Sequence, residues 1–288
     1  MKIAVASGKG GTGKTFLATN LAQYLSGERP VVLVDLDVEE PNAGLFFNTQ
    51  VIHHEIKYSM IPEWDPERCT LCGLCQDLCH FHAIVQADPK LIIFPELCHS
   101  CYACSELCPE QALPMKPRRI GILSRQSGRN FRFVQGELDV GQEQVVPLIH
   151  QIIQYVDENY PADMIKIYDA PPGTSCPVVE AVKQADYVIL VTEPTPFGLH
   201  DLKLAVEAMR QLGKSMGVVI NREGLGDTHV EEFCQKMQVP ILAHIPHDRH
   251  IAERYSRGEL MDTLPEIRSA LKAIEAQVLE NEIQVVLS

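Results

Sequence analysis

The stretch that decides the fold reads KIAVASGKGGTGKT and spans residues 2–15. It begins with a short apolar run, continues with a loop of the pattern G-x-x-x-x-G-K-[ST], and leads into a predicted helix at 14–27. A strand, a glycine-rich loop and a helix in this order bind phosphate, because backbone N–H groups and the helix N-terminus face the anion. We therefore predict a nucleotide-binding loop formed by Gly8, Lys9, Gly10, Gly11, Thr12, Gly13, Lys14 and Thr15.

Two side chains of this loop add chemistry to that of the backbone. We expect Lys14 to place its charge at the outer phosphates and Thr15 to bind Mg²⁺ through its hydroxyl. A glycine turn that only joins a strand to a helix would need neither a second lysine nor this threonine. The loop is therefore predicted to bind a nucleoside triphosphate, with Mg²⁺, rather than to serve as a plain connection.

Further apolar runs indicate that the loop belongs to a layered α/β core. Helical segments are expected between and after them, at 142–159, 177–185, 199–212, 229–237 and 265–279, and the runs themselves lie at 31–36, 165–169, 187–191, 218–221 and 240–243. Strands that alternate with helices form a mostly parallel sheet with helices on both faces. We therefore predict a doubly wound α/β fold, with strands or a hairpin at 120–138 leading out of an inserted segment.

Eight of the ten cysteines form two copies of one pattern. The first copy is Cys69-x2-Cys72-x2-Cys75-x3-Cys79, and the second, 29 residues later, is Cys98-x2-Cys101-x2-Cys104-x3-Cys108. Such tight and regular spacing in a chain expected to be cytoplasmic indicates metal binding rather than disulfides. We therefore predict an inserted small α+β module at 62–117, within a nucleotide-binding domain made of 1–61 and 118–288.

The double pattern resembles that of bacterial dicluster ferredoxins along the length of the module. The resemblance implies two [4Fe-4S] clusters, each bound by three closely spaced thiolates and by the fourth cysteine of the other repeat. Zinc is the alternative for CxxC arrays, but the double spacing favours clusters. The implied ligand sets are Cys69, Cys72, Cys75 and Cys108 for one cluster, and Cys98, Cys101, Cys104 and Cys79 for the other.

Lys9 makes the phosphate loop resemble the deviant Walker A motif of MinD, ParA, Mrp and the nitrogenase iron protein. This resemblance covers nearly the whole chain and implies a MinD-like P-loop ATPase that is slow or depends on a partner. It also implies an ATP-dependent dimer in which Lys9 reaches the phosphates of the partner subunit, much as an arginine finger does. The partner is expected to be a second copy or a related paralogue.

Further segments fall where that family has site residues. Asp37 resembles the switch I aspartate that orients the attacking water, with Asp35 as the rival candidate. Asp169 ends an apolar run and resembles the Walker B aspartate of the Mg²⁺ shell. Asn221 and Arg222 resemble the position that binds adenine, where an amide can both donate and accept. With these three segments, the resemblance assigns catalytic roles to Lys9, Lys14, Asp37 and Asp169.

Four residues stand outside these patterns. His80 occupies the position that a proline has in the second repeat, and His82 follows it; surface histidines without a role are the simplest interpretation. Cys176 lies seven residues after Asp169. It resembles a nitrogenase iron protein cysteine that binds a cluster between subunits, with Cys234 as the other candidate. For Cys176 we favour a small packed thiol.

The composition of the 288 residues restricts the class of protein. Hydrophobic residues make up 45%, yet no run approaches the roughly 20 apolar residues of a membrane span. The formal net charge of -13 disfavours binding to nucleic acid or anionic membranes. The first residues lead directly into the phosphate loop, without a signal-peptide pattern. We therefore expect a cytoplasmic protein that binds neither nucleic acid nor membranes.

Two functions fit these expectations. The first is an ATP-gated electron-transfer protein that delivers electrons through two [4Fe-4S] clusters to a redox partner. The alternative is an iron–sulfur assembly or carrier ATPase of the Mrp type, although the sequence has no CxxC motif near its C-terminus. A positioning or partitioning ATPase is disfavoured because residues 266–288 lack the basic amphipathic helix of a membrane anchor.

Overall fold

The computed structural model describes residues 1–47, 50–127 and 131–280. The chain divides into two compact units. We call the first the core unit; it comprises Met1–His54, Leu123–Glu137 and Ile149–Ser288. We call the second the cysteine unit; it comprises Glu55–Ile122 and Leu138–Leu148, and the predicted insert 62–117 lies within it.

A nine-stranded sheet is formed by the described residues, in the order β11-β10-β9-β1-β8-β2-β7-β6-β3. The neighbouring strands from β11 to β7 pair in parallel, as the apolar runs predict. The strands are β1 (Lys2–Ala6), β2 (Val31–Asp35), β3 (Gln50–Pro62), β6 (Met115–Ser127), β7 (Phe131–Leu138), β8 (Ile165–Asp169), β9 (Tyr187–Thr192), β10 (Ser215–Glu223) and β11 (Ile241–Pro246).

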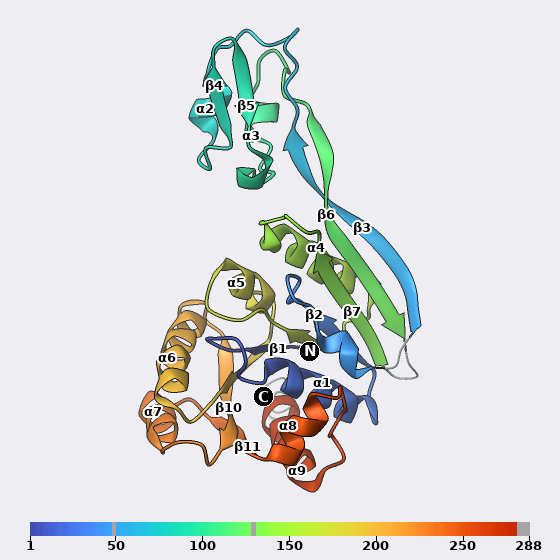
Figure 1. Ribbon diagram of the computed structural model, residues 1–288, viewed down its shortest axis with the longest axis vertical. Helices are drawn as coiled ribbons and strands as arrows, with labels where there is room; N and C mark the ends of the chain where they lie inside the picture. Colours follow the sequence, from blue (N-terminus) through green and yellow to red (C-terminus); the bar gives the residue numbers. More distant parts are fainter. Residues whose placement is uncertain (48–49, 128–130, 281–288) are drawn as a thin grey trace, which may run out of the picture. The chain divides into compact units, whose positions relative to one another are not determined.

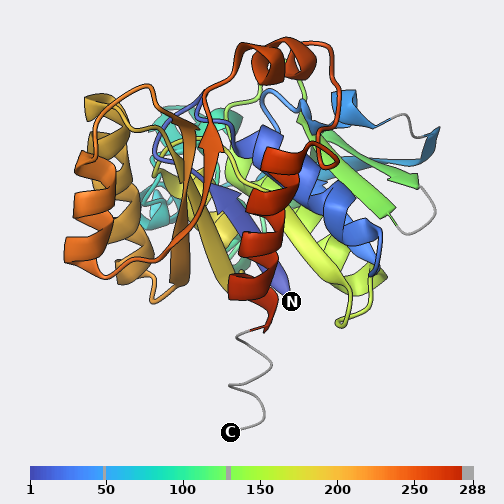
Figure 2. The same ribbon diagram turned by 90° about the horizontal axis from the view of Figure 1, so that it is seen from below.

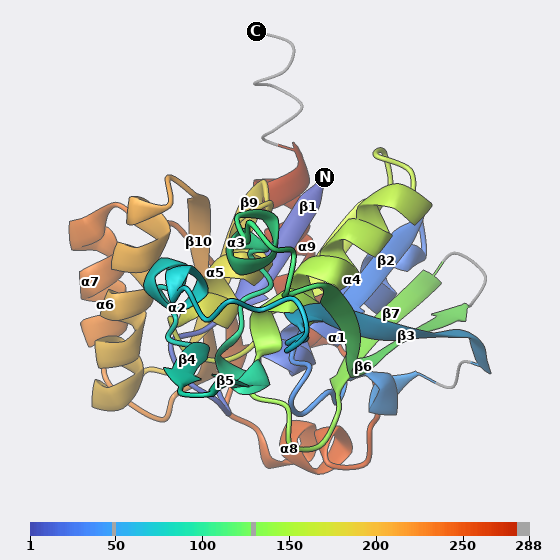
Figure 3. The same cartoon turned by 90° about the horizontal axis from the view of Figure 1, so that it is seen from above.

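Helices cover both faces of the parallel strands, so the prediction of a doubly wound α/β core is confirmed. Helices α1 and α9 cross one face (Figure 2), and α4, α5 and α6 lie on the opposite face (Figure 3). The helices of the core are α1 (Lys14–Ser26), α4 (Val145–Asn159), α5 (Cys176–Val182), α6 (Pro196–Gln211), α7 (His229–Met237), α8 (Arg249–Tyr255) and α9 (Pro265–Glu275).

Alternate side chains of the strands fill the layer beneath α1 and α9. Ile3 and Val5 of β1 and Leu33 of β2 pack there against Leu17 and Leu21 of α1, all at most 1% exposed. Burial at about 25 cal/mol per Å² of apolar surface makes this layer a large stabilising contribution to the core unit. The layer holds the carboxyl ends of β1, β8 and β2 at one edge of the sheet, where parallel α/β folds bind their ligands.

Some elements differ from the sequence prediction. Helix α8 and strand β3 were not predicted; β3 mixes charged and apolar residues and so has no clear apolar run. Residues 120–138 do form strands, β6 and β7, but residues 128–130 lie outside the described residues. Residues 281–288 also lie outside them, so part of the segment 266–288, for which we expect no membrane anchor, is not described.

The cysteine unit includes most of β3 and β6 and the first residues of α4. Beyond them it contains a hairpin, two short helices and the loops that carry the cysteines (Figure 1). In the hairpin, β4 (Ile84–Ala87) pairs antiparallel with β5 (Lys90–Ile93). The helices are α2 (Leu74–Leu78) and α3 (Ala103–Glu106). Two small apolar clusters form its interior. Cys98 packs with Ile61 and Ala83 in one of them, and Cys69, Cys75 and Cys104 pack against the other.

The two cysteine repeats also have the same backbone. Asp65 N–H donates to Ala112 C=O, and Phe94 N–H, 29 residues later, donates to Ala83 C=O. The left-handed conformations repeat as well, with positive φ at residues 71 and 100, 73 and 102, and 82 and 111. Non-glycine residues adopt this region only at a cost, so the fold around the cysteines is closely specified in both halves.

Candidate nucleotide site and cysteine cavities

The phosphate loop joins β1 to α1 in the core unit and requires glycine at its last turn. Gly13, the residue before α1, has φ 98°, and a Cβ there would lie 2.3 Å from Asn221 Nδ2. That amide donates to the Thr12 carbonyl over 2.7 Å, so β10 supports the loop directly. Both the left-handed backbone and the close approach therefore exclude a side chain at this position.

A cavity opens beside the loop at the carboxyl ends of the strands. It encloses about 1290 Å³ not filled by protein, part of it open to solvent. Predicted site residues among its lining are Gly10, Gly11, Gly13, Lys14, Thr15, Asp37, Asn221 and Arg222. Residues that the sequence analysis missed form the rest of the wall, chiefly Pro246, His247, Asp248, Ile251 and Tyr255. These residues end or follow β11. The rule that parallel α/β sheets bind ligands at the carboxyl ends of their strands is the signal that could have indicated them.

The two aspartates after β2 have different surroundings. Asp35 is fully buried, and its carboxylate accepts hydrogen bonds from the N–H groups of Asp37, Asn42 and Ala43 at 2.9–3.1 Å. It therefore fixes the loop that follows β2. Asp37 lines the cavity instead, and burial raises the pKa of its carboxyl although Lys14 opposes the shift. Of the two candidates, Asp37 is the one that faces the nucleotide cavity.

Asp169 ends β8 directly opposite Asp35 in the sheet register. It is 1% exposed, and neither of its carboxylate oxygens has a hydrogen-bond partner among the described residues. Burial raises its pKa to about 7, while the nearby Thr15 hydroxyl and the Lys14 ammonium act to lower it. Burial also lowers the pKa of Lys14, against the charges of Asp169 and Asp37. A buried carboxylate without a partner, beside a phosphate loop, is a site suited to a cation.

Lys9 and Arg222 both contact Glu193, a residue that the sequence patterns did not indicate. Lys9 Nζ lies 3.5 Å from Oε2 of Glu193, and Arg222 donates to Oε1 of the same carboxylate. Arg222 also donates to the Gly11 carbonyl over 3.3 Å. Asn221 supports the loop through Thr12, and its amide keeps a second N–H and a second lone pair for a ligand.

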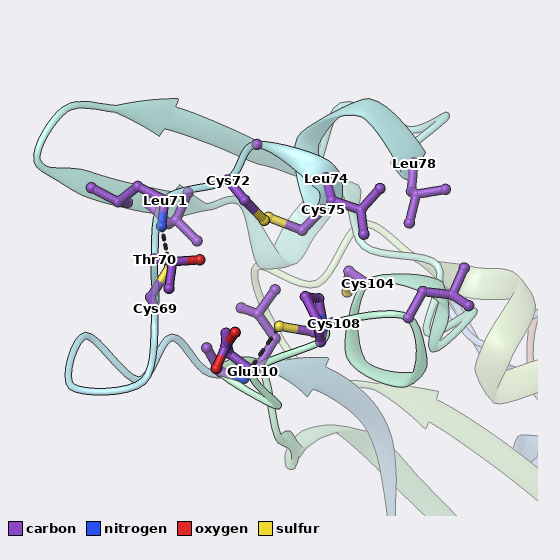
Figure 4. Close-up of a pocket in the computed structure, with 16 residues that line it drawn as sticks. Cys69, Thr70, Leu71, Cys72, Leu74, Cys75, Leu78, Cys104, Cys108 and Glu110 are labelled. Carbon is purple, nitrogen blue, oxygen red and sulfur yellow. Dashed lines mark hydrogen bonds between the residues drawn. The ribbon is translucent and has the colours of Figure 1, made fainter.

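One cavity of the cysteine unit is lined by the four cysteines of the first predicted set (Figure 4). It encloses about 420 Å³ not filled by protein, part of it open to solvent. Leu74 and Leu78 of α2 and the carboxylate residue Glu110 complete its wall, together with Cys104. The first cavity is thus lined by five cysteines: the predicted set Cys69, Cys72, Cys75 and Cys108, and Cys104 of the other set.

A second cavity, of about 360 Å³, is lined by the four cysteines of the other set, Cys98, Cys101, Cys104 and Cys79. Its fourth cysteine comes from the first repeat, just as Cys108 of the second repeat lines the first cavity. The walls differ, however: Phe81, His99 and Tyr102 line the second cavity where Glu110, Thr70 and Gly73, at the equivalent positions, line the first. The rings of Phe81 and His99 stack at 3.7 Å.

Backbone N–H groups point at several of these sulfurs. Leu71 N–H donates to Cys69 Sγ at 3.4 Å, and Ala83 and Ala112 donate to Cys79 and Cys108, each at 3.3 Å. Such donors stabilise thiolates and tune clusters bound to them. Without a bound ion, burial raises the pKa of the Cys104 thiol to about 11, with neighbouring thiols adding to the shift.

No group of three or more His, Cys, Asp or Glu side chains within the described ranges is arranged to hold a single metal ion. Four iron atoms of a cubane stand apart, so the thiolates that bind it surround a space instead of converging on a point. Each cysteine set lines a cavity instead of converging on one point.

The remaining candidates lie away from these cavities. Cys234 is fully buried in α7, and burial raises its pKa to about 11, so it cannot present a thiolate at a subunit surface. Cys176, by contrast, is exposed at the start of α5, which differs from the packed thiol that we favoured. His80 and His82 are both exposed.

Residues 3–261 match the model of the CobQ/CobB/MinD/ParA nucleotide binding domain. The chain belongs to this family. Two uncharacterized proteins of Methanocaldococcus jannaschii are similar over much of the chain: MJ0578 is 36% identical over 79% of this chain and 80% of its own length, and MJ0579 is 29% identical over 95% and 96%.

A solved structure has the same fold as this chain. The septum site-determining protein MinD of Pyrococcus horikoshii, complexed with Mg-ADP, superposes with a TM-score of 0.61 at 21% identity, over 98% of this chain and 97% of its own. A cytosolic Fe-S cluster assembly factor NUBP1 homolog of Brugia malayi is 24% identical over 90% of this chain and 73% of its own length. Within the described residues, no helix is long and apolar enough to cross a membrane.

Proposed function

We propose that this protein is an ATPase that gates electron transfer through two [4Fe-4S] clusters bound by the cysteine unit. The observation that carries the proposal is the pair of cavities: the four cysteines of each predicted set line one of them, with the fourth cysteine exchanged between repeats, and Cys104 of the second set borders both. This exchange is the ligand pattern of two cubanes bound by adjacent repeats. Bound clusters would each accept and release one electron.

The core unit would supply the nucleotide switch. The backbone N–H groups of the loop and Lys14 would bind the phosphates, and Thr15 and Asp169 would hold Mg²⁺, which gives the buried carboxylate its missing partner. Asp37, on the cavity wall, would accept a hydrogen bond from the attacking water. We infer that Lys9 completes the site of a second subunit in an ATP-dependent dimer, either a homodimer or a pair with a paralogue.

Gating would follow from this switch. Contacts to the outer phosphate order the loops after β2 and β8 in related machines, and hydrolysis releases them. A dimer that forms only with ATP would therefore present or withdraw the surface on which a redox protein docks. Electrons would move only while that surface is presented.

An iron–sulfur assembly or carrier role is the second candidate, favoured by the likeness to an Fe-S cluster assembly factor over 90% of the chain. The two candidates differ in what ATP does to iron. A carrier releases its cluster when nucleotide binds or turns over, whereas an electron-transfer protein keeps both clusters and changes their redox behaviour.

Anaerobic purification with iron and sulfide analysis, followed by EPR of the dithionite-reduced protein titrated with Mg-ATP, tests the proposal. We expect two cluster signals whose potentials or line shapes shift with nucleotide. A Lys14→Ala variant is the matched control, since it should keep the iron and lose the response. Loss of iron on addition of Mg-ATP would support the carrier role, and a protein without iron and sulfide would refute both.

A further inference from the structure

Glu193 places one buried carboxylate between two cations from different segments of the core unit. Its side chain is 9% exposed, and its Oε2 lies 3.5 Å from Lys9 Nζ. Its Oε1 accepts a hydrogen bond from Arg222 Nη1. Lys9 belongs to the phosphate loop and Arg222 to the end of β10, so the carboxylate links both segments to the end of β9.

The backbone around Glu193 is held rigidly. Its carbonyl accepts a hydrogen bond from Thr195 N–H at 2.8 Å, and the Thr195 hydroxyl caps α6 by accepting from Gly198 N–H at 3.0 Å. Thr192 donates to the Gly198 carbonyl at 3.0 Å, and a Cβ on Gly198 would lie 2.2 Å from the Glu193 carbonyl oxygen. These contacts hold the backbone that carries the Glu193 carboxylate in place beside Lys9 and Arg222.

Arg222 would stay on this carboxylate if Lys9 left it. Its backbone is held at φ 57°, in the left-handed region that non-glycine residues seldom adopt, and its second guanidinium nitrogen donates to the Gly11 carbonyl. Removing the sole partner of a buried charge is strongly destabilising, but Glu193 keeps one partner when Lys9 departs. Breaking the contact between Lys9 and Glu193 therefore costs little free energy.

Lys9 is anchored by its backbone and free to move at its side chain. Its carbonyl accepts a hydrogen bond from Ser7 Oγ at 2.5 Å, while its side chain is 33% exposed, against 9% for Glu193. An ion pair of this exposure stabilises one arrangement of the lysine only modestly. Lys9 thus has a defined position in the free subunit, and an anion that binds it more strongly than Glu193 does would displace it.

We propose that Glu193 is a latch that holds Lys9 against its own subunit and releases it to the phosphates of a second subunit. The proposal rests on the ATP-dependent dimer of the proposed function. It adds Glu193 as the residue whose contact with Lys9 must be broken before two subunits pair. In the free subunit, Glu193 is the ion-pair partner of Lys9. When two subunits pair, Lys9 contacts the partner's nucleotide, and Arg222 alone neutralises Glu193.

The first test measures the latch in the nucleotide-free protein. Lysines are modified by brief reductive methylation, and the extent at Lys9 is compared with that at the exposed Lys236 by mass spectrometry. Glu193→Gln should raise the relative reactivity of Lys9 about two- to fivefold, the factor for an ion pair of this exposure. Arg222→Gln should lower it, because Lys9 then becomes the sole partner of the carboxylate.

Glu207→Gln is the matched control, because it makes the same chemical change on α6 at a carboxylate that accepts from Gln211. It should leave the reactivity of Lys9 unchanged. A general loosening of the fold would raise the reactivity of several lysines in every variant, whereas the latch predicts changes at Lys9 that have opposite signs for the two substitutions. Unchanged reactivity of Lys9 in Glu193→Gln overturns the latch.

The second test measures pairing with Mg-ATP by sedimentation. A homodimer releases two copies of Lys9, so Glu193→Gln should lower its dissociation constant by about four- to twenty-five-fold, the square of the single-site factor. A wild type that stays monomeric with Mg-ATP overturns the homodimer of the proposed function, and with it the transfer of Lys9 between two copies of this chain. A wild type that pairs while Glu193→Gln pairs no more tightly overturns the latch alone.

Discussion

Replacing Gly13 by alanine should destabilise the core unit through two separable effects. The backbone at φ 98° costs an L-residue about 1–2 kcal/mol. The new Cβ, 2.3 Å from Asn221 Nδ2, must also displace the amide from the Thr12 carbonyl, which costs about 0.5–1.5 kcal/mol. The sum is about 1.5–3.5 kcal/mol. Nucleotide affinity should fall as well, because the loop carbonyls and N–H groups lose their support.

The assay is hydrogen-exchange mass spectrometry of α1 peptides across a urea series, which reports the core unit separately from the cysteine unit. Gly213→Ala is the matched control, since Gly213 has φ 65° with no atom within 4 Å of the place that a Cβ would occupy, and it should cost the strain alone. In an Asn221→Ala background, Gly13→Ala should cost the same as Gly213→Ala. Equal costs of Gly13→Ala with and without Asn221 would refute the steric argument.

Three further predictions follow from the same contacts. Cys108→Ser should remove about half of the iron of the anaerobically purified protein and leave the second EPR signal, while Cys176→Ser should remove none. Glu110→Gln should raise the reduction potential of the cluster in the first cavity only, because a negative charge on its wall disfavours an added electron; an EPR redox titration in which both signals shift equally would contradict this. The pKa of Asp157 is below its ordinary value because hydrogen bonds and charges of Lys166 and Lys2 outweigh its burial, so the stability that this carboxylate contributes is present above about pH 4 and lost as pH falls through the lowered pKa. Asp157→Asn should therefore destabilise the core unit by about 1–2 kcal/mol at pH 7, discounted for partial exposure, and by little at pH 3 in urea unfolding.

Local sequence patterns were sufficient for the phosphate loop and for the parallel core. The glycines, lysines and threonine of residues 8–15 are contiguous, and the helix and strand periods lie within single segments, so nearby residues carry the information. The spacing of the cysteines likewise indicated two equivalent half-modules. The structure extends that equivalence to backbone conformations, which no side-chain pattern expresses at positions such as Ser100 and Leu71.

The sequence by itself determined the nucleotide-binding class and the order of the core elements, and it predicted the sets of cysteines, because each depends on residues close together in the chain or on an exact repeat. Only the tertiary structure showed that Asp37 lines the cavity while Asp35 holds the loop after β2, placed Pro246 and the residues after it in the cavity wall, and brought Glu193 to Lys9. These contacts join segments from separate strands of one sheet edge. Packing of whole elements sets such distances, and no local pattern records them.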